Sequence, residues 1–124
     1  MKIYSSTEWL ADNKKKYRSV FDKNDSSYIY TEFSFFNLNF KSKDWDLKLN
    51  LICLDQNKNE VCNLNCDRTI SKNTNLVYIR EGWGTYNLGG YWQSGTYKWV
   101  AEVDGEIVAE KSFYVQDIGV VTTD

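Results

Sequence analysis

The sequence has no histidine, no proline and only three cysteines. Without histidine, the serine and cysteine triads in their usual form are excluded, because the nucleophile of such a site needs a base beside it. Three cysteines cannot all pair, which favours a reducing compartment over a secreted disulfide scaffold. Without proline, exposed strand edges must be protected by other residues, and the lysines at 14–16 are candidates.

Charge and hydropathy exclude further classes of protein. The net charge is −2, and acidic and basic residues are interspersed, so no basic stripe is present to neutralise a phosphate backbone. The N-terminus lacks the apolar core of a signal peptide, and no later stretch approaches the roughly twenty apolar residues of a membrane span. We therefore expect a cytoplasmic protein with neither a nucleic-acid partner nor a membrane partner.

The composition is that of one folded domain. The chain has 124 residues, of which 42% are hydrophobic and 16% aromatic, enough for a single core. We predict one domain over residues 1–124. Residues 1–24 form edge strands and loops, residues 25–117 form the core sandwich, and residues 118–124 form a tail.

Apolar residues recur with a period of two along the chain, and a helical period is lacking. The run from Trp45 to Asp55 alternates cleanly and predicts a central strand. Other strands are expected around Lys2–Ser5, Tyr17–Phe21, Tyr28–Asn37 and Asn75–Glu81. About seven or eight short strands predict an all-β, immunoglobulin-like sandwich of two antiparallel sheets, with a small barrel as the competing architecture.

Two hairpins have predictable registers. Closure about Asn57 and Lys58 places Cys53 opposite Cys62, with Leu51 opposite Leu64 and Leu49 opposite Cys66. The last hairpin surrounds Asp104-Gly105, where we expect a three-residue loop with a glycine bulge, residues 103–105. That loop keeps apolar residues together, pairing Trp99 with Ala109, Ala101 with Ile107 and Val100 with Val108.

The segment from Gly82 to Trp99 holds three of the five tryptophans and five of the seven glycines. The most specific spacing joins Gly82-Trp83-Gly84, Trp92, Gly95, Tyr97, Trp99, Asp104-Gly105 and Phe113. Within Tyr28 to Val115, this pattern resembles an immunoglobulin-like β-sandwich domain of unknown function found N-terminal to AAA-type ATPase modules in bacterial proteins.

The resemblance implies an accessory or interaction domain, and it offers no catalytic residue to carry over. This chain departs from the pattern at Ser94, where proline is usual, and it has no ATPase region. It is therefore either a domain of a longer protein or a free-standing relative.

The candidate chemical groups do not form a convincing reactive site. Cys62 and Cys66 lie about 13 Å apart if they share one strand, too far to hold a metal together, so we predict no metal and no cofactor. Buried free thiols are favoured over a disulfide between Cys53 and Cys62. Carboxylates capable of acid-base work are present, but most fall at turns or on outward strand positions, so we predict no enzyme activity.

Exposed aromatic residues are the candidate contacts with a partner. Tyr86 and Tyr91 lie in the glycine-rich loop, Trp83 lies beside it, and Tyr28 and Tyr30 form a second patch on a strand. Tyrosines on flexible loops suit protein recognition, which predicts a protein-binding module, either associated with an ATPase or acting as a free-standing binder or inhibitor.

The competing hypothesis is a carbohydrate-binding module in which Trp83, Tyr86, Tyr91 and Trp92 stack on sugar rings. Against both uses stands a structural one. Trp92 and Trp99 fold into the core, Trp83 covers the end of the sandwich, and Tyr97 forms a tyrosine corner whose hydroxyl bonds to the preceding loop. Tyr28 and Tyr30 could likewise lie under the segment around Trp9.

Overall fold

Ten strands and one 3₁₀ turn, Lys23–Asp25, build the part of the chain that the computed structural model describes, residues 1–6 and 17–118. The strands are β1 (Lys2–Ser6), β2 (Val20–Asp22), β3 (Tyr28–Phe36), β4 (Trp45–Leu47), β5 (Leu49–Leu54), β6 (Glu60–Asn65), β7 (Arg68–Ile70), β8 (Leu76–Gly84), β9 (Gly95–Val103) and β10 (Glu106–Gln116). The prediction of an all-β fold is confirmed. The segment around Trp9 and the lysines at 14–16 lie outside the described residues.

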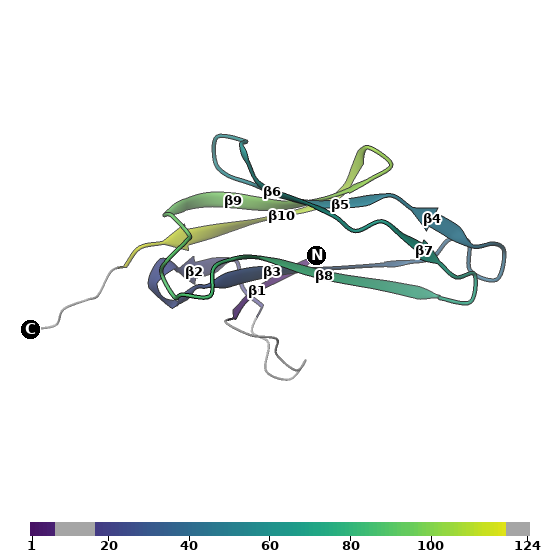
Figure 1. Cartoon of the computed structure of the whole chain (residues 1–124), viewed down its shortest axis with the longest axis horizontal. Coiled ribbons are helices and arrows are strands. Elements are labelled where there is room, and N and C mark those ends of the chain that lie inside the picture. Colours follow the sequence, from purple (N-terminus) through teal and green to yellow (C-terminus); the bar gives the residue numbers. More distant parts are fainter. Residues whose placement is uncertain (7–16, 119–124) are drawn as a thin grey trace, which may run out of the picture.

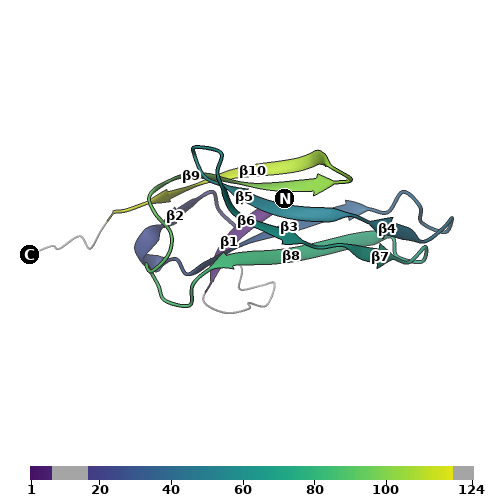
Figure 2. The ribbon, with the colours of Figure 1, turned by 45° about the horizontal axis from the view of Figure 1, so that its top comes forward.

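The strands form two layers (Figure 1). One sheet has the order β1-β3-β8, the other has the order β2-β10-β9-β5-β6, and β4 pairs with β7 in a short ribbon. The loop after β8 and the end of β10 lie at one end of the sandwich, and β4 and β7 lie at the other (Figure 2). All pairs are antiparallel except β2 with β10, a parallel edge pair that the expected antiparallel sandwich did not include.

The strand count exceeds the predicted seven or eight because one predicted strand is divided in two and because β7, Arg68–Ile70, was not predicted. The run from Trp45 to Asp55 divides at Lys48 into β4 and β5. There the Lys48 carbonyl accepts a hydrogen bond from the Asp104 N–H (3.0 Å), and the Leu49 N–H donates to the Asp67 carboxylate (2.9 Å). The strand expected around Tyr17–Phe21 is the shorter β2, Val20–Asp22.

Alternation along β5 builds the centre of the core. Leu47, Leu49, Leu51 and Cys53 are buried on the inner face, as the sequence predicts. Ile52 is buried as well, on the outer face, where it lies opposite the buried Val100 of β9. The central strands therefore bury one apolar pair, Ile52 and Val100, on an outer face that is otherwise largely polar, in addition to their apolar inner face.

The β5–β6 hairpin has the predicted register. Cys53 lies opposite Cys62 and Leu51 opposite Leu64, and the Cys66 N–H donates to the Leu49 carbonyl (2.8 Å). All three cysteines are buried free thiols. Burial raises the pKa of Cys62 and of Cys66 to about 11, so both thiols stay protonated at neutral pH and are weak nucleophiles.

The predicted register of the β9–β10 hairpin is wrong. Val103 pairs with Glu106 around a two-residue turn in which Asp104 (φ 51°) and Gly105 (φ 83°) both have positive φ, as a type I′ turn requires. The register shifts between Ile107 and Ala109, so the bulge lies in β10 and not in the turn. Ala101 then faces Ala109, Trp99 faces Lys111 and Val100 faces Glu110, in place of the expected partners Ile107, Ala109 and Val108.

Candidate functional site

The glycine-aromatic segment begins as a strand and not as a loop. Strand β8 continues through Trp83 to Gly84, and β9 starts at Gly95, so the connecting loop covers residues 85–94. Trp92 in this loop is fully buried, its indole N–H donates to the Ser27 carbonyl (2.9 Å), and its ring packs edge-on against Phe113. The predicted structural roles of Trp92 and of the buried Trp99 are confirmed.

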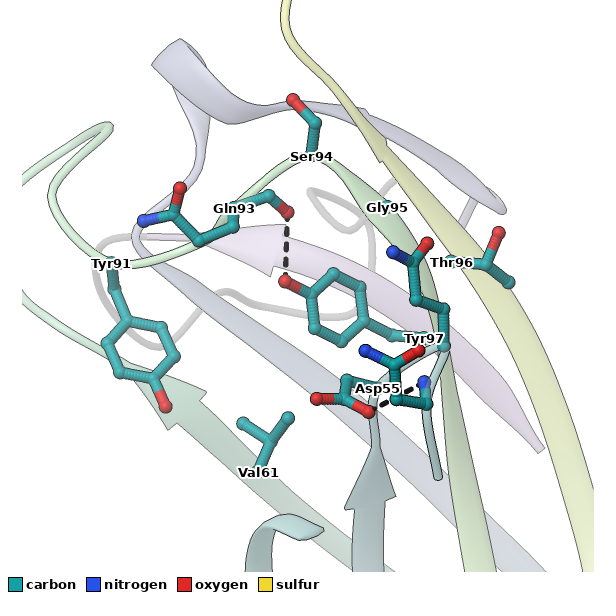
Figure 3. A pocket seen from close by; sticks show the side chains of 10 residues that line it. Asp55, Val61, Tyr91, Gln93, Ser94, Gly95, Thr96 and Tyr97 are labelled. Carbon is teal, nitrogen blue, oxygen red and sulfur yellow. Dashed lines mark hydrogen bonds between the residues drawn. The ribbon is translucent and has the colours of Figure 1, made fainter. Parts of the chain in front are cut away.

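Tyr97 forms the predicted corner. Its hydroxyl donates to the Gln93 carbonyl (2.9 Å), which closes the loop onto the start of β9 (Figure 3). Its ring stacks on Phe113 with 5.4 Å between centroids, and burial raises the pKa of its hydroxyl. This half of the segment is therefore part of the core.

Trp83 and Tyr91 are tied to each other. The Trp83 indole N–H donates to the Tyr91 hydroxyl (2.9 Å), and Trp83 lies opposite the buried Ile29, on the inner face of its sheet. Both side chains are partly buried against the core. Tyr86, in contrast, is 73% exposed. Of the predicted contact residues in this loop, it presents the most accessible ring.

Tyr28 and Tyr30 lie on the outer face of the three-stranded sheet. Their ring centroids are 6.2 Å apart, and the Arg80 guanidinium lies 5.9 Å from the centre of the Tyr30 ring. Tyr30 covers Gly82 on β8, where an added Cβ would meet the ring at 2.4 Å. The five predicted contact residues therefore occupy three separate places, and their role in binding stays a prediction.

A polar groove of about 250 Å³ lies at the loop end, between the β5–β6 turn and residues 91–97 (Figure 3). Tyr91, Gln93 and Ser94 line it on one side and Asp55 on the other. One Asp55 carboxylate oxygen already accepts hydrogen bonds from the N–H groups of Asn57 (2.8 Å) and Asn59 (2.9 Å), so this acid stabilises its own turn. The groove offers hydroxyl, amide and carboxylate groups beside a single accessible ring.

A larger and mostly apolar groove, of about 740 Å³, lies toward the opposite end of the sandwich. Its walls come from the second half of β3, from β4 and from the β9–β10 hairpin, and they include Phe33, Phe35, Phe36, Leu38, Trp45 and Val108. The Phe35 ring packs against Phe33 and edge-on against Trp45, which fixes the floor of the groove.

Large apolar side chains surround this groove on the surface. Leu38 is 95% exposed and Phe36 is 68% exposed, and Leu76 lies opposite Phe36 on the same face. We call Phe36, Leu38, Leu76 and Val108 the apolar end of the molecule; more than half of each side chain is exposed. Exposed apolar groups gathered around a groove are typical of interaction sites.

Sequence reasoning missed the apolar end although a signal was present. In the run FSFFNLNF, Phe35 and Phe36 are adjacent, so one of the two must leave the core face of an alternating strand. Leu38 follows beyond the end of β3, where no strand partner covers it within the described residues.

Two further features concern residues 1–6 and 17–118, the part of the chain that the structure describes. No three histidine, cysteine or carboxylate side chains gather there as a metal site would require. None of the helical structure in that part of the chain is long and apolar enough to cross a membrane.

The two packed sheets and their edge pairing define an immunoglobulin-like β-sandwich. Solved structures similar to this chain include two from Pseudomonas. An immunoglobulin-like protein of Pseudomonas aeruginosa matches with a TM-score of 0.52 and 10% identity, over 92% of this chain and 91% of that one. The Pseudomonas fluorescens alkylpurine DNA glycosylase AlkC, solved bound to DNA with an abasic-site analogue, matches with a TM-score of 0.57 and 11% identity, over 79% of this chain.

The match with AlkC spans only 27% of the length of that enzyme, so it concerns one part of a larger protein. Neither a family profile nor a curated protein matches the sequence. At this level of identity the two likenesses establish the fold.

Proposed function

We propose that this protein is a non-catalytic protein-binding module and that the apolar end is its contact surface. The observation that carries the proposal is the gathering of Phe36, Leu38 and Val108, all more than half exposed, around an apolar groove of about 740 Å³, with the equally apolar Leu76 opposite Phe36. Leaving such side chains in water is unfavourable by about 25 cal/mol per Å² of apolar surface, and a protein partner removes that surface from water.

Binding of a carbohydrate at the loop end has less support. Trp92 is fully buried and presents no face for stacking, and Trp83 is partly buried with its N–H bonded to Tyr91, which limits its access to a sugar ring. The polar groove retains one accessible ring, Tyr91, beside Gln93 and Ser94. A glycan array that stays blank with the intact protein would remove this alternative.

The non-catalytic character of the proposed module is supported by its chemical groups. The chain has no histidine, and burial keeps the three thiols protonated by raising their pKa values. Free buried thiols also agree with a cytoplasmic protein, which we include in the proposal. The resemblance to domains preceding AAA-type ATPase modules makes an ATPase one candidate partner, and a host protein bound by a free-standing inhibitor is the other.

Replacing Leu38 by aspartate tests the proposal directly. Because Leu38 is 95% exposed, the substitution leaves the fold intact, but it places a charge where an apolar partner surface would dock. We expect the immobilised wild-type domain to retain a protein from an extract of the source cell, and the Leu38→Asp variant to retain about tenfold less or none.

Tyr86→Ala is the matched control, since Tyr86 is also largely exposed but lies at the loop end. Its retained protein, quantified by mass spectrometry, is expected to equal that of the wild type. Retention that survives Leu38→Asp and disappears with Tyr86→Ala would move the contact surface to the loop and refute the proposal.

A further inference from the structure

The open edge of β3 lies directly beside the apolar groove. Strand β1 pairs with the first half of β3. The pair nearest the groove joins Lys2 of β1 to Glu32 of β3. Within the described residues, Phe33–Phe36 have β8 on one side and no strand on the other. The start of β1 lies midway along the sandwich, while β3 continues toward β4 and β7 (Figure 2).

The hydrogen-bonding groups at this edge can be assigned by parity. The Asn37 N–H donates to the Asn75 carbonyl (2.7 Å), which lies on the β8 side. Backbone groups of successive strand residues point to opposite sides, so the N–H and C=O groups of Ser34 and Phe36 point to the open edge. The pairing with β1 agrees with this assignment. The Ile3 carbonyl faces away from β3, where it accepts a hydrogen bond from the Arg18 N–H, so the backbone groups of the neighbouring Lys2 point toward β3 and those of its partner Glu32 point toward β1.

The second open edge on this side of the sandwich, in β10, is protected. Strand β2 covers only Tyr114–Gln116 of β10. Two features interrupt the part of β10 between the turn and Tyr114. The register shift after Ile107 distorts the edge, and Lys111 belongs to the inner face because it lies opposite the buried Trp99. A bulge and an inward charge are two devices that stop a strand from accepting a partner. Residues 33–36 of β3 carry neither.

Both faces of the β3 edge have a recess for side chains. An added strand would place residues opposite Phe33 and Phe35 on the inner face, over the apolar groove. A residue opposite Ser34 would lie on the outer face, beside a smaller recess of about 350 Å³ whose lining includes Lys2, Glu32 and Tyr78 as well as Met1 and Leu76. In this recess Glu32 accepts hydrogen bonds from the Tyr17 and Tyr78 hydroxyls. The inner recess suits apolar side chains, and the outer one offers polar partners, among them Lys2 and Tyr78, beside the apolar Leu76.

We propose that β3 binds an extended segment of a partner protein by strand addition, continuing the ladder that β1 begins. The bound segment alternates apolar residues, which enter the groove, with polar residues, which face Lys2 and Tyr78. Backbone hydrogen bonds to Ser34 and Phe36 hold it in register, as in other cases of strand addition. This inference rests on the proposed protein-binding function and adds its mode and the chemistry of the partner segment.

A displayed library of random heptapeptides, selected on the intact wild-type protein, is the probe. We expect the enriched peptides to alternate apolar and polar residues. Ser34→Pro removes the N–H that faces the open edge without removing a bond to β8, and it should weaken the selected peptides about tenfold or more. Ser112→Pro is the matched control. The Tyr114 N–H donates to the Ser19 carbonyl at the β10 edge, and the Ser112 N–H, two residues earlier on the same strand, points to that same edge. Proline at position 112 therefore also removes an edge N–H, but peptide binding should be unchanged.

Amide hydrogen exchange supplies an independent readout on the unmodified protein. The Ser34 and Phe36 amides should exchange fast in the free protein and become protected when a selected peptide saturates it, whereas the Phe35 amide, paired with β8, should be protected in both states. If Ser34→Pro lowers the unfolding midpoint and its binding data become ambiguous, the exchange of the Ser34 and Phe36 amides in the wild-type protein still tests strand addition.

The outcomes separate the binding mode from the proposed function. If the wild-type protein enriches no peptide more strongly than the Leu38→Asp variant does, both the proposed function and the proposed binding mode are refuted. If peptides depend on Leu38 but bind Ser34→Pro as tightly as wild type and leave the Ser34 and Phe36 amides unprotected, only strand addition is overturned. Protection that grows with protein concentration alone would show a second copy of the chain at this edge and would also overturn the proposal.

Discussion

Replacing Trp92 by alanine is expected to lower the free energy of unfolding by about 3–5 kcal/mol, which is the usual cost of removing a buried tryptophan. The Trp92 side chain is fully buried between Tyr97 and Phe113, with ring centroids 5.0 and 5.7 Å away. Its loss leaves a cavity and removes the hydrogen bond to the Ser27 carbonyl. Chemical denaturation followed by tryptophan fluorescence measures the change.

Tyr86→Ala is the control from the same loop. The Tyr86 side chain is largely exposed, so its removal should change stability by no more than about 0.5 kcal/mol. If the two variants unfold at similar denaturant concentrations, Trp92 is not part of the core, and the loop regains its place as a candidate binding site.

Gly84→Ala is expected to destabilise the protein by about 2–4 kcal/mol, because two separate costs act at this position. Gly84 has φ +145°, a conformation that L side chains rarely adopt. An added Cβ would also lie 2.0 Å from the Ser27 carbonyl oxygen, the atom that accepts the Trp92 hydrogen bond. The methyl group therefore displaces the anchor of the loop as well as straining β8.

Gly105→Ala separates the two costs. Gly105 also has positive φ (83°), but a Cβ there would meet no atom within 4 Å, so only the conformational cost of about 1 kcal/mol applies. Thermal unfolding of both variants gives the comparison. Equal losses at the two positions would mean that the Ser27 carbonyl moves freely and does not anchor the loop.

Local patterns predicted the elements whose two faces differ clearly. The alternation of Leu47 to Cys53 gave β5 its inner face, and the symmetric apolar pairing gave the β5–β6 register. Tyr97 was placed by its position two residues before a buried tryptophan. In each case one sheet face is apolar and the other polar, so only one arrangement buries the apolar set.

The β9–β10 hairpin shows where that logic fails. Matching apolar residues across the strands assumed that Ile107 packs inside opposite Ala101 and that Val108 meets Val100 outside. Both Ile107 and Val108 are more than half exposed, and neither has the expected partner. The Asp104-Gly105 turn chemistry fixes the hairpin instead, and the bulge restores Ala109 to the inner face opposite Ala101. An apolar residue at the surface misleads register prediction, and here it marks the apolar end.

Strand edges could not be predicted because they depend on which strands become neighbours. The sequence of β3 indicates a strand over its whole length, but only the order β1-β3-β8 and the register of Lys2 with Glu32 reveal that residues 33–36 have an open side. The parallel pairing of β2 with β10 is equally non-local. The candidate binding surface therefore emerges from topology, while the tyrosines that the sequence singled out are distributed over three places.

Site-specific photocrosslinking in the source cell tests the protein-binding function most directly. The photoreactive amino acid p-benzoylphenylalanine would replace Leu38 in one variant, at the apolar end, and Tyr86 in another, at the loop end. If the apolar end is the contact surface, position 38 gives a discrete crosslinked protein and position 86 gives none. Crosslinks from position 86 alone, or from neither position, would contradict that assignment.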